Sequence, residues 1–278
     1  MKNKCFRMTA VLLIILGVQT IQAQTSPDIS SFFDWNRNLP PGTLLHYEIS
    51  TAKTDNDASQ KTDFWIYYAS DTKIETFHKE ENLGTGNGIL HDIWIVNPSS
   101  GQFERNIRQN LNPPENQTQM TIDSFYDASA RKIRKQYINT IKGKETVQSE
   151  EIPMVWSPMV MHKDLGFWFF AFMPHIKKEA EEFTVCFNSY SHLILMDVSP
   201  GEKDDLEGTA CTKYTMRGLG LLSGLLHRGT IWMTDEQMAV IQKMDILIAL
   251  SWKLPRLHFQ LIQKDLVSYE EWLQMMEL

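Results

Sequence analysis

The residues that could carry out chemistry in this sequence do not form a recognisable catalytic set. The eight histidines are scattered, with no His-Glu-x-x-His motif and no pair at metal-ligand spacing. His162 and His175 flank an aromatic segment, where a metal or acid–base role is one interpretation and an ordinary capping or surface position is the other. The spacing predicts no metal, no cofactor and no catalytic residue, so we expect a protein that is not an enzyme.

Two glycine-containing segments resemble functional motifs but lack their structural requirements. In residues 220–224 (GLLSG), Ser223 is misplaced for a nucleophile elbow and no strand–turn–helix pattern follows. Residues 84–88 (GTGNG) lack the lysine and the helix of a phosphate-binding loop. We interpret the first segment as a packed connection and the second as a flexible turn.

Large apolar side chains are the remaining candidates for function. The chain contains 8 Trp, 14 Phe and 14 Met, and methionine and aromatic side chains adapt to irregular apolar ligands. The alternative is that they only fill a core, where most apolar strand residues lie. The residues that we expect to line a ligand cavity are Trp65, Tyr67, Trp94, Leu165, Trp168, Phe169 and Trp232.

The first 23 residues predict an export signal. Lys2, Lys4 and Arg7 precede a short apolar run, and Ala23 marks a plausible cleavage site. The run is shorter than the roughly 18 to 20 residues that cross a bilayer. We therefore expect a mature chain without a transmembrane segment, in the periplasm of a Gram-negative bacterium.

Charge excludes a nucleic-acid partner. The signal takes three of the 27 basic residues and none of the 34 acidic ones, which leaves a formal charge of −10 on the mature chain. Binding to phosphate backbones needs clustered Lys and Arg. The one basic cluster, residues 131–135, is interpreted as a solvated strand face rather than as a phosphate site.

Cys186 and Cys211 are the two cysteines that follow the signal. In an oxidising compartment an isolated pair can form a disulfide. Each also lies in an apolar strand pattern, so a disulfide and two free buried thiols remain alternatives.

Short alternating segments separated by turns predict a mainly β fold. Residues 208–246 form the clearest unit, with two strands, a turn at 235–237 and a long returning strand. We expect a curved antiparallel sheet, an incomplete β-barrel, in a single domain over residues 42–278 that follows an N-terminal arm at 24–41. Further strands are predicted at residues 45–50, 63–69, 73–78, 91–96, 120–126, 132–141, 183–187, 192–198 and 257–261, and loops at 110–117 and 200–207.

One or two helices are predicted to cover this sheet. Asp164 is placed to cap a helix over 165–173, which is apolar on all sides and must be buried or must cover an apolar surface. Ser268 is placed to cap a C-terminal helix in which Trp272 and Met276 recur at helical spacing.

Three segments carry a resemblance to a known group of proteins. They are GTLLHYE at residues 42–48, GTACTKY at 208–214 and GTIWMTDE at 229–236. The chain resembles exported bacterial proteins of unknown function that are similar in fold to the lipoprotein carriers LolA and LolB. The resemblance implies an incomplete barrel around an apolar cavity with helices as its lid, and it implies no catalytic residues.

We therefore expect a periplasmic, non-enzymatic binding protein for an apolar ligand, a lipid or an acyl chain. The first alternative is a structural or assembly factor of the cell envelope that docks a protein partner through its aromatic segment. The second is an enzyme whose residues converge from distant parts of the chain, which a cluster of perturbed polar groups in the cavity would indicate.

Overall fold

The structure is a computed structural model of the 278-residue chain, and it describes the strands, several turns and the C-terminal helix. The described residues are 39–52, 60–80, 88–97, 103–111, 119–127, 129–130, 132–141, 143–153, 160–161, 183–189, 192–218, 227–236, 239–248 and 256–277. The predicted signal peptide, the predicted arm up to residue 38 and the predicted helix at 165–173 lie outside these residues. Within the described part of the chain, no helix is long and apolar enough to cross a membrane.

The described strands join into one sheet of fifteen strands. Their order is β8-β7-β6-β5-β4-β3-β2-β1-β15-β14-β13-β12-β11-β10-β9. Strands β1 to β8 therefore extend from the middle of the sheet to one edge, and strands β9 to β15 run from the other edge back to the middle, where β15 pairs with β1. Neighbours pair antiparallel, with the exception of β9 and β10, which are parallel. The predicted class, a curved and mainly antiparallel sheet, is confirmed. The strands are β1 (Thr43–Ala52), β2 (Gln60–Ser70), β3 (Lys73–Glu80), β4 (Gly88–Val96), β5 (Phe103–Leu111), β6 (Gln119–Asp127), β7 (Lys132–Ile141), β8 (Lys144–Pro153), β9 (Val160–Met161), β10 (Phe183–Ser189), β11 (His192–Leu206), β12 (Thr209–Gly218), β13 (His227–Thr234), β14 (Ile241–Ile248) and β15 (Arg256–Leu266).

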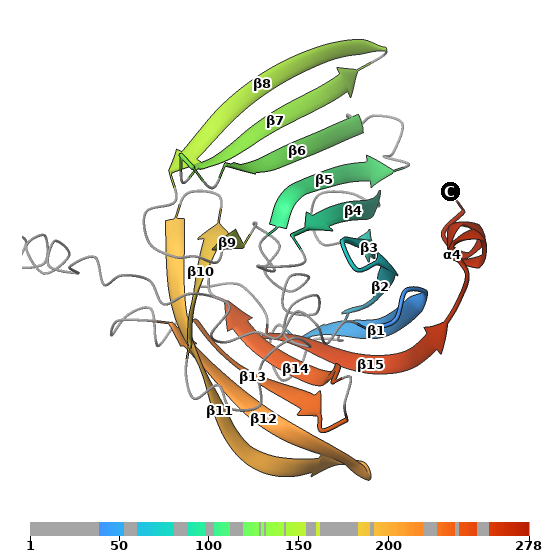
Figure 1. Ribbon diagram of the computed structural model, residues 1–278, viewed down its shortest axis with the longest axis vertical. Helices are drawn as coiled ribbons and strands as arrows, with labels where there is room; N and C mark the ends of the chain where they lie inside the picture. The colour runs from blue at the N-terminus through green and yellow to red at the C-terminus, as the bar shows by residue number, and fades with distance from the viewer. Residues whose placement is uncertain are drawn as a thin grey trace, which may run out of the picture.

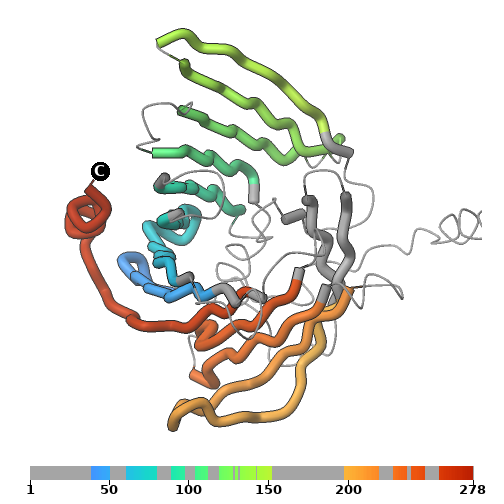
Figure 2. The backbone as a smooth tube through the Cα atoms, turned by 180° about the vertical axis from the view of Figure 1, so that it is seen from behind, coloured from blue at the N-terminus to red at the C-terminus, as the bar shows by residue number. Residues whose placement is uncertain are grey.

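The sheet curls into an open barrel with a concave and a convex face (Figure 1). The single described helix, α4 (Tyr269–Met275), lies on the convex side in both views (Figures 1 and 2). Because successive side chains of a strand point to opposite faces, contact with α4 assigns each residue to one face. Leu44 and Tyr67 pack against α4 and face the convex side, whereas Leu45 and Tyr47 face the concave side.

The predicted unit at residues 208–246 is confirmed as β12, β13 and β14. The turn into β12 places Glu207 and Gly208 at φ of 54° and 87°, the positive values that a two-residue hairpin with the right twist requires. Gly229 allows a close approach within this unit. A Cβ atom there would lie 2.6 Å from the Met216 side chain and 2.8 Å from the Asp245 carbonyl oxygen.

The C-terminal helix α4 is also confirmed, with the predicted cap. The Ser268 side chain accepts a hydrogen bond from the Glu271 backbone N–H, and the Glu271 carboxylate accepts one from the Ser268 N–H. The helix buries Trp272, whose ring stacks on Tyr67 at a centroid distance of 5.1 Å and meets Phe77 edge-on at 5.2 Å.

Several strand segments differ from the sequence prediction, including the two-residue strand β9, which was not predicted. β5 and β8 were not predicted, because their polar residues give no alternating apolar pattern. The predicted loop at 200–207 is wrong, since β11 continues to Leu206 past an irregularity between Pro200 and Lys203. Pro200 is tolerated there because proline occurs in strands mainly at bulges and edges.

Candidate binding site on the concave face

The concave face has an apolar half formed by strands on both sides of β1. Tyr47 shows how tightly it packs, since its hydroxyl crosses the face to donate to the Ile241 carbonyl oxygen at 2.9 Å. The side chains on this half are large, apolar and buried, so they present no group that could bind a charge. Their members include Leu45, Tyr47, Ile49, Phe64, Ile66, Tyr214, Met216, Ile231, Met244, Ile246 and Phe259.

The other half of the concave face, over β3 to β7, carries buried polar side chains in two rows that run across the strands. The first polar row is Asn106, Ser124 and Lys135, which are directly opposite one another on β5, β6 and β7. The second polar row is Thr76, Asp92 and Arg108 on β3, β4 and β5. All six residues are buried. Polar groups are rarely buried without partners, so the partners of these side chains indicate what each row does.

In the second polar row, Asp92 is fully satisfied. The Arg108 guanidinium donates to both carboxylate oxygens, with Nη2 to Oδ2 at 2.6 Å and Nε to Oδ1 at 2.9 Å. Asn106 Nδ2 also donates to Asp92 Oδ1 at 3.1 Å. A bidentate pair of this kind fixes the orientation of both side chains. It also fixes the Asn106 amide, because its nitrogen and not its oxygen can donate to a carboxylate.

In the first polar row, three groups lack such partners. Among the residues that the structure describes, Asn106 Oδ1 and Ser124 Oγ are buried and receive no hydrogen bond. The Lys135 side chain is only 6% exposed and makes no hydrogen bond or ion pair with a described residue. Opposite residues on neighbouring strands have Cβ atoms about 5 Å apart. The row therefore gathers an unpaired acceptor, an unpaired hydroxyl and an unpaired ammonium group in one place.

Burial changes the proton affinity of two bases on this half. Burial, together with the positive charge of Arg108, lowers the pKa of Lys135, while Glu150 acts in the opposite direction. Burial and Arg108 also lower the pKa of His78 to about 4, against an opposing effect of Asp92. His78 is therefore neutral at pH 7, and the buried formal charges of the polar half are those of Asp92, Arg108 and Lys135.

Ser124 and Lys135 lie side by side on β6 and β7, and no hydrogen bond joins Ser124 Oγ to Lys135 Nζ. Among the described residues, no group of three or more His, Cys, Asp or Glu side chains could hold a metal ion.

Sequence reasoning missed the polar rows, and the prediction for residues 131–135 is wrong at Lys135. That prediction described a solvated strand face, whereas Lys135 is buried on the concave face. A signal was present, because Lys135 shares one face of β7 with Ile133, which is buried, and with Tyr137. A lysine flanked at i−2 and i+2 by residues of a buried face belongs to that face. On β5, the equivalent signal is the polar alternation of Asn106, Arg108 and Asn110.

The four described residues that were predicted to line one cavity lie on different faces, which corrects that prediction. Trp94 is buried on the concave face, opposite Asn106. Trp65 and Tyr67 lie on the convex face against the cluster that α4 covers. Trp232 is also on the convex face, where its Nε1 donates to Asp204 at 2.8 Å and Lys243 lies 4.9 Å from its ring centroid. The other three candidates, Leu165, Trp168 and Phe169, lie outside the described residues.

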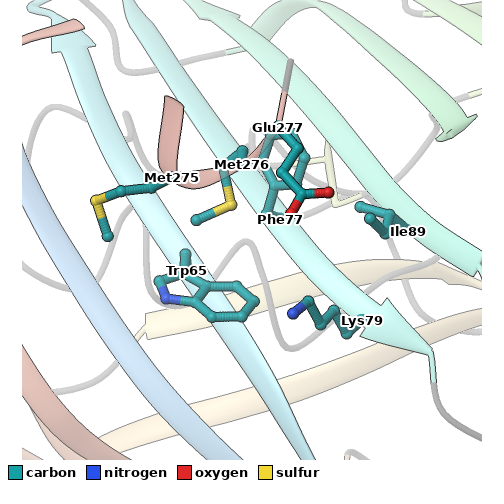
Figure 3. Close-up of a pocket in the computed structure, with 7 residues that line it drawn as sticks. All are labelled: Trp65, Phe77, Lys79, Ile89, Met275, Met276 and Glu277. Atoms are coloured by element: carbon teal, nitrogen blue, oxygen red, sulfur yellow. The ribbon is translucent and has the colours of Figure 1, made fainter. Parts of the chain in front are cut away.

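Trp65 does line a hollow on the convex face, between β2 to β4 and the end of α4 (Figure 3). The hollow encloses about 420 Å³, including space that is open to solvent. Its wall is apolar with one lysine and one glutamate at the rim. The lining residues are Trp65, Phe77, Lys79, Ile89, Met275, Met276 and Glu277.

Of the two alternatives for Cys186 and Cys211, the disulfide is not formed in this structure, where Cys211 is a free, buried thiol. Strand register gives the reason. Cys186 is opposite Leu195, and Cys211 is opposite Asp204, nine residues further along β11. This is roughly 30 Å of strand, whereas the Cα atoms of a disulfide lie within about 7 Å. Burial and nearby aspartates raise the pKa of Cys211 to about 11.

The chain was compared with protein families, curated proteins and solved structures. No family model matches the sequence, and no curated protein matches it. Among solved structures, the chain is similar to the crystal structure of a β-barrel-like protein of the domain of unknown function DUF1849 from Brucella abortus. The two share 7% sequence identity with a TM-score of 0.47, over 83% of this chain and 100% of that one.

Proposed function

We propose that this chain is an exported, non-enzymatic binding protein that holds an apolar ligand, a lipid or an acyl chain, on the concave face of its open barrel. The observation that carries the proposal is the division of that face into a continuous apolar half and a half with unpaired buried polar groups. A lipid has the same division, with an apolar chain joined to a polar head.

The apolar half supports contact with the chain of such a ligand. Met216, Met244 and Phe259 lie on three different strands of this half and are buried. Methionine adapts its shape to irregular apolar surfaces. Small-molecule sites in proteins have this composition, mostly apolar with a few placed polar groups.

The sequence supports the location and the class of protein. Residues 1–23 have the charge and length of a cleaved export signal, which favours the periplasm. The resemblance of residues 42–48, 208–214 and 229–236 to proteins that are similar in fold to LolA and LolB also favours a carrier of apolar molecules.

Native mass spectrometry of the mature protein, purified from its own cell envelope, tests the proposal. We expect a bound mass that extraction with organic solvent removes and that identifies the ligand class. A protein that is free of ligand before extraction, and that fails to bind any single-chain amphiphile added afterwards, contradicts the proposal.

Two matched substitutions decide which face binds. Met216→Gln places a polar amide of similar shape on the concave face, whereas Met275→Gln makes the same change at the convex hollow, where Met275 is 52% exposed. We expect Met216→Gln to reduce the bound fraction and Met275→Gln to leave it unchanged, with thermal unfolding as the check that both variants are folded. The reverse result would move the site to the hollow of Figure 3.

A further inference from the structure

We propose that the first polar row, Asn106, Ser124 and Lys135, is a subsite that binds the anionic oxygens of the ligand's headgroup. This inference rests on the proposed function and specifies the headgroup that the site accepts. The chemical class is an amphiphile with a single chain and a phosphate or carboxylate head.

The unmatched hydrogen-bonding capacity of the row indicates a ligand. An unpaired buried hydroxyl or amide oxygen costs free energy, and this row contains one of each beside a buried ammonium group. The three unpaired groups lie directly opposite one another on three adjacent strands, in one buried row. An oxyanion would accept from Lys135 Nζ and from the Ser124 hydroxyl at the same time.

The surroundings make this surface selective for an anion. Asp92 is the one acid in the two polar rows, and Arg108 and Asn106 occupy both of its oxygens. It therefore leaves Lys135 without a carboxylate partner. Glu150, opposite Lys135 on β8, is exposed and accepts from the Tyr137 hydroxyl at 2.9 Å. The buried charge of the polar half is then +1, in a chain with a formal charge of −7.

Asn106 favours a phosphate monoester over a carboxylate. Its Oδ1 is an acceptor, because Nδ2 is held by Asp92. Below its second pKa of about 6, a phosphate monoester is singly ionised and carries a P–OH donor beside its anionic oxygens, whereas an ionised carboxylate carries none. We therefore expect alkyl phosphates to bind more tightly than alkyl carboxylates of the same chain length.

Three probes with one chain length test the subsite: decyl phosphate, decanoate and decanol. Their affinities are measured by isothermal titration calorimetry on the delipidated mature protein, below their critical micelle concentrations. We expect the phosphate to bind roughly tenfold or more tightly than decanol, since hydrogen bonds to charged groups are strong. Decanoate should fall between them, and a carboxylate that binds as tightly as the phosphate would identify a fatty acid head instead.

Lys135→Met, which keeps the apolar stem and removes the charge, should abolish the preference for the anions over decanol. Lys132→Met is the matched control, because Lys132 lies on the same strand but on the opposite, convex face, where it pairs with Glu151 at 2.8 Å. Ser124→Ala should weaken both anions several-fold, and it decides the question if Lys135→Met does not fold.

The outcomes separate the subsite from the proposed function. If decanol and the anions bind equally well to the wild-type protein, or if Lys135→Met and Lys132→Met behave alike, the headgroup subsite is wrong, but the proposed apolar-ligand carrier still stands. If none of the three probes binds, the proposed function as an apolar-ligand carrier is itself wrong.

Discussion

The two faces of the sheet each bury a carboxylate, and they treat it differently. On the convex face, Glu75 is 1% exposed and accepts hydrogen bonds from Tyr269 at 3.1 Å and Trp272 at 3.3 Å of α4, and from His91 at 3.1 Å. Lys73 pairs with it at 2.5 Å. The Glu75 carboxylate is therefore fully paired, and its hydrogen bonds from Tyr269 and Trp272 hold α4 against the sheet.

On the concave face, Asp92 is satisfied in the same way by Arg108 and Asn106, but its surroundings are not. Asn106 Oδ1 and Ser124 Oγ have no partner among the described residues, and Lys135 makes no ion pair there. A satisfied buried network stabilises one conformation, whereas an unsatisfied one costs stability. The convex network therefore supports the fold, whereas the concave one has the free hydrogen-bonding capacity on which the proposed headgroup subsite depends.

The largest expected effect comes from Arg108→Met, which leaves the Asp92 carboxylate buried without its counter-charge. Removing one partner of a buried ion pair costs about 3 to 5 kcal/mol. The free energy of unfolding, measured by urea denaturation, should fall by that amount. A loss of less than about 1 kcal/mol would mean that Asp92 is solvated or protonated.

Glu75→Gln tests the convex network and should cost about 3 kcal/mol, because the amide offers two donors to a site built of donors. Trp272 fluorescence should report the release of α4 before the sheet unfolds. Glu145→Gln is the matched control, since Glu145 is exposed on β8 and its loss should change stability by less than about 0.5 kcal/mol. Equal losses of stability in Glu75→Gln and Glu145→Gln would contradict a structural role for Glu75.

A fall in pH should remove the stabilising contributions of His78 and Glu75, which lie on opposite faces, in two different pH ranges. Burial and Arg108 lower the pKa of His78 to about 4 in the folded protein, from 6.5. The unfolded chain therefore binds a proton first, and stability that is present above pH 6.5 is lost as the pH falls from 6.5 to 4. The loss amounts to roughly 3 kcal/mol, and His78→Leu should abolish this component of a stability profile.

Glu75 contributes in a lower window. Burial alone would raise its pKa, but hydrogen bonds from His91, Lys73 and Trp272 outweigh this effect and lower the pKa to about 2. Its depressed pKa stabilises the fold above pH 4.5, and this contribution is lost between pH 4.5 and 2. A single transition for both groups would show that the two faces do not titrate independently.

The smallest expected effect is that of Lys135→Met on stability. Replacing a buried charge that has no partner by an apolar side chain of similar length should leave the free energy of unfolding unchanged or raise it by up to about 1 kcal/mol. A loss of 2 kcal/mol or more would show that Lys135 supports the fold. The proposed difference between the satisfied convex network and the unsatisfied concave row would then be wrong.

Prediction from the sequence was most accurate where one face of a strand is apolar. β1 and β12 were predicted from their alternation, β2 from its apolar residues on both faces, and Ser268 located the start of α4. It was least accurate where the site lies. β5 was missed because Asn106 and Arg108 occupy positions that an ordinary strand would fill with apolar residues. The site itself had no signature in any one segment, because its row is assembled from β5, β6 and β7.

The sequence by itself determined that this protein is mainly β, that its strands alternate and that a capped helix ends the described chain, because these features depend on neighbours within about four residues. Tertiary structure decided which face each side chain occupies and which groups it meets. Trp65 and Trp94 have similar sequence surroundings, yet α4 covers the face of the first while the second lies beside the polar rows. Lys135 differs from Lys132 in the same way. The curl of the sheet buries one and exposes the other, and no local pattern specifies that curl.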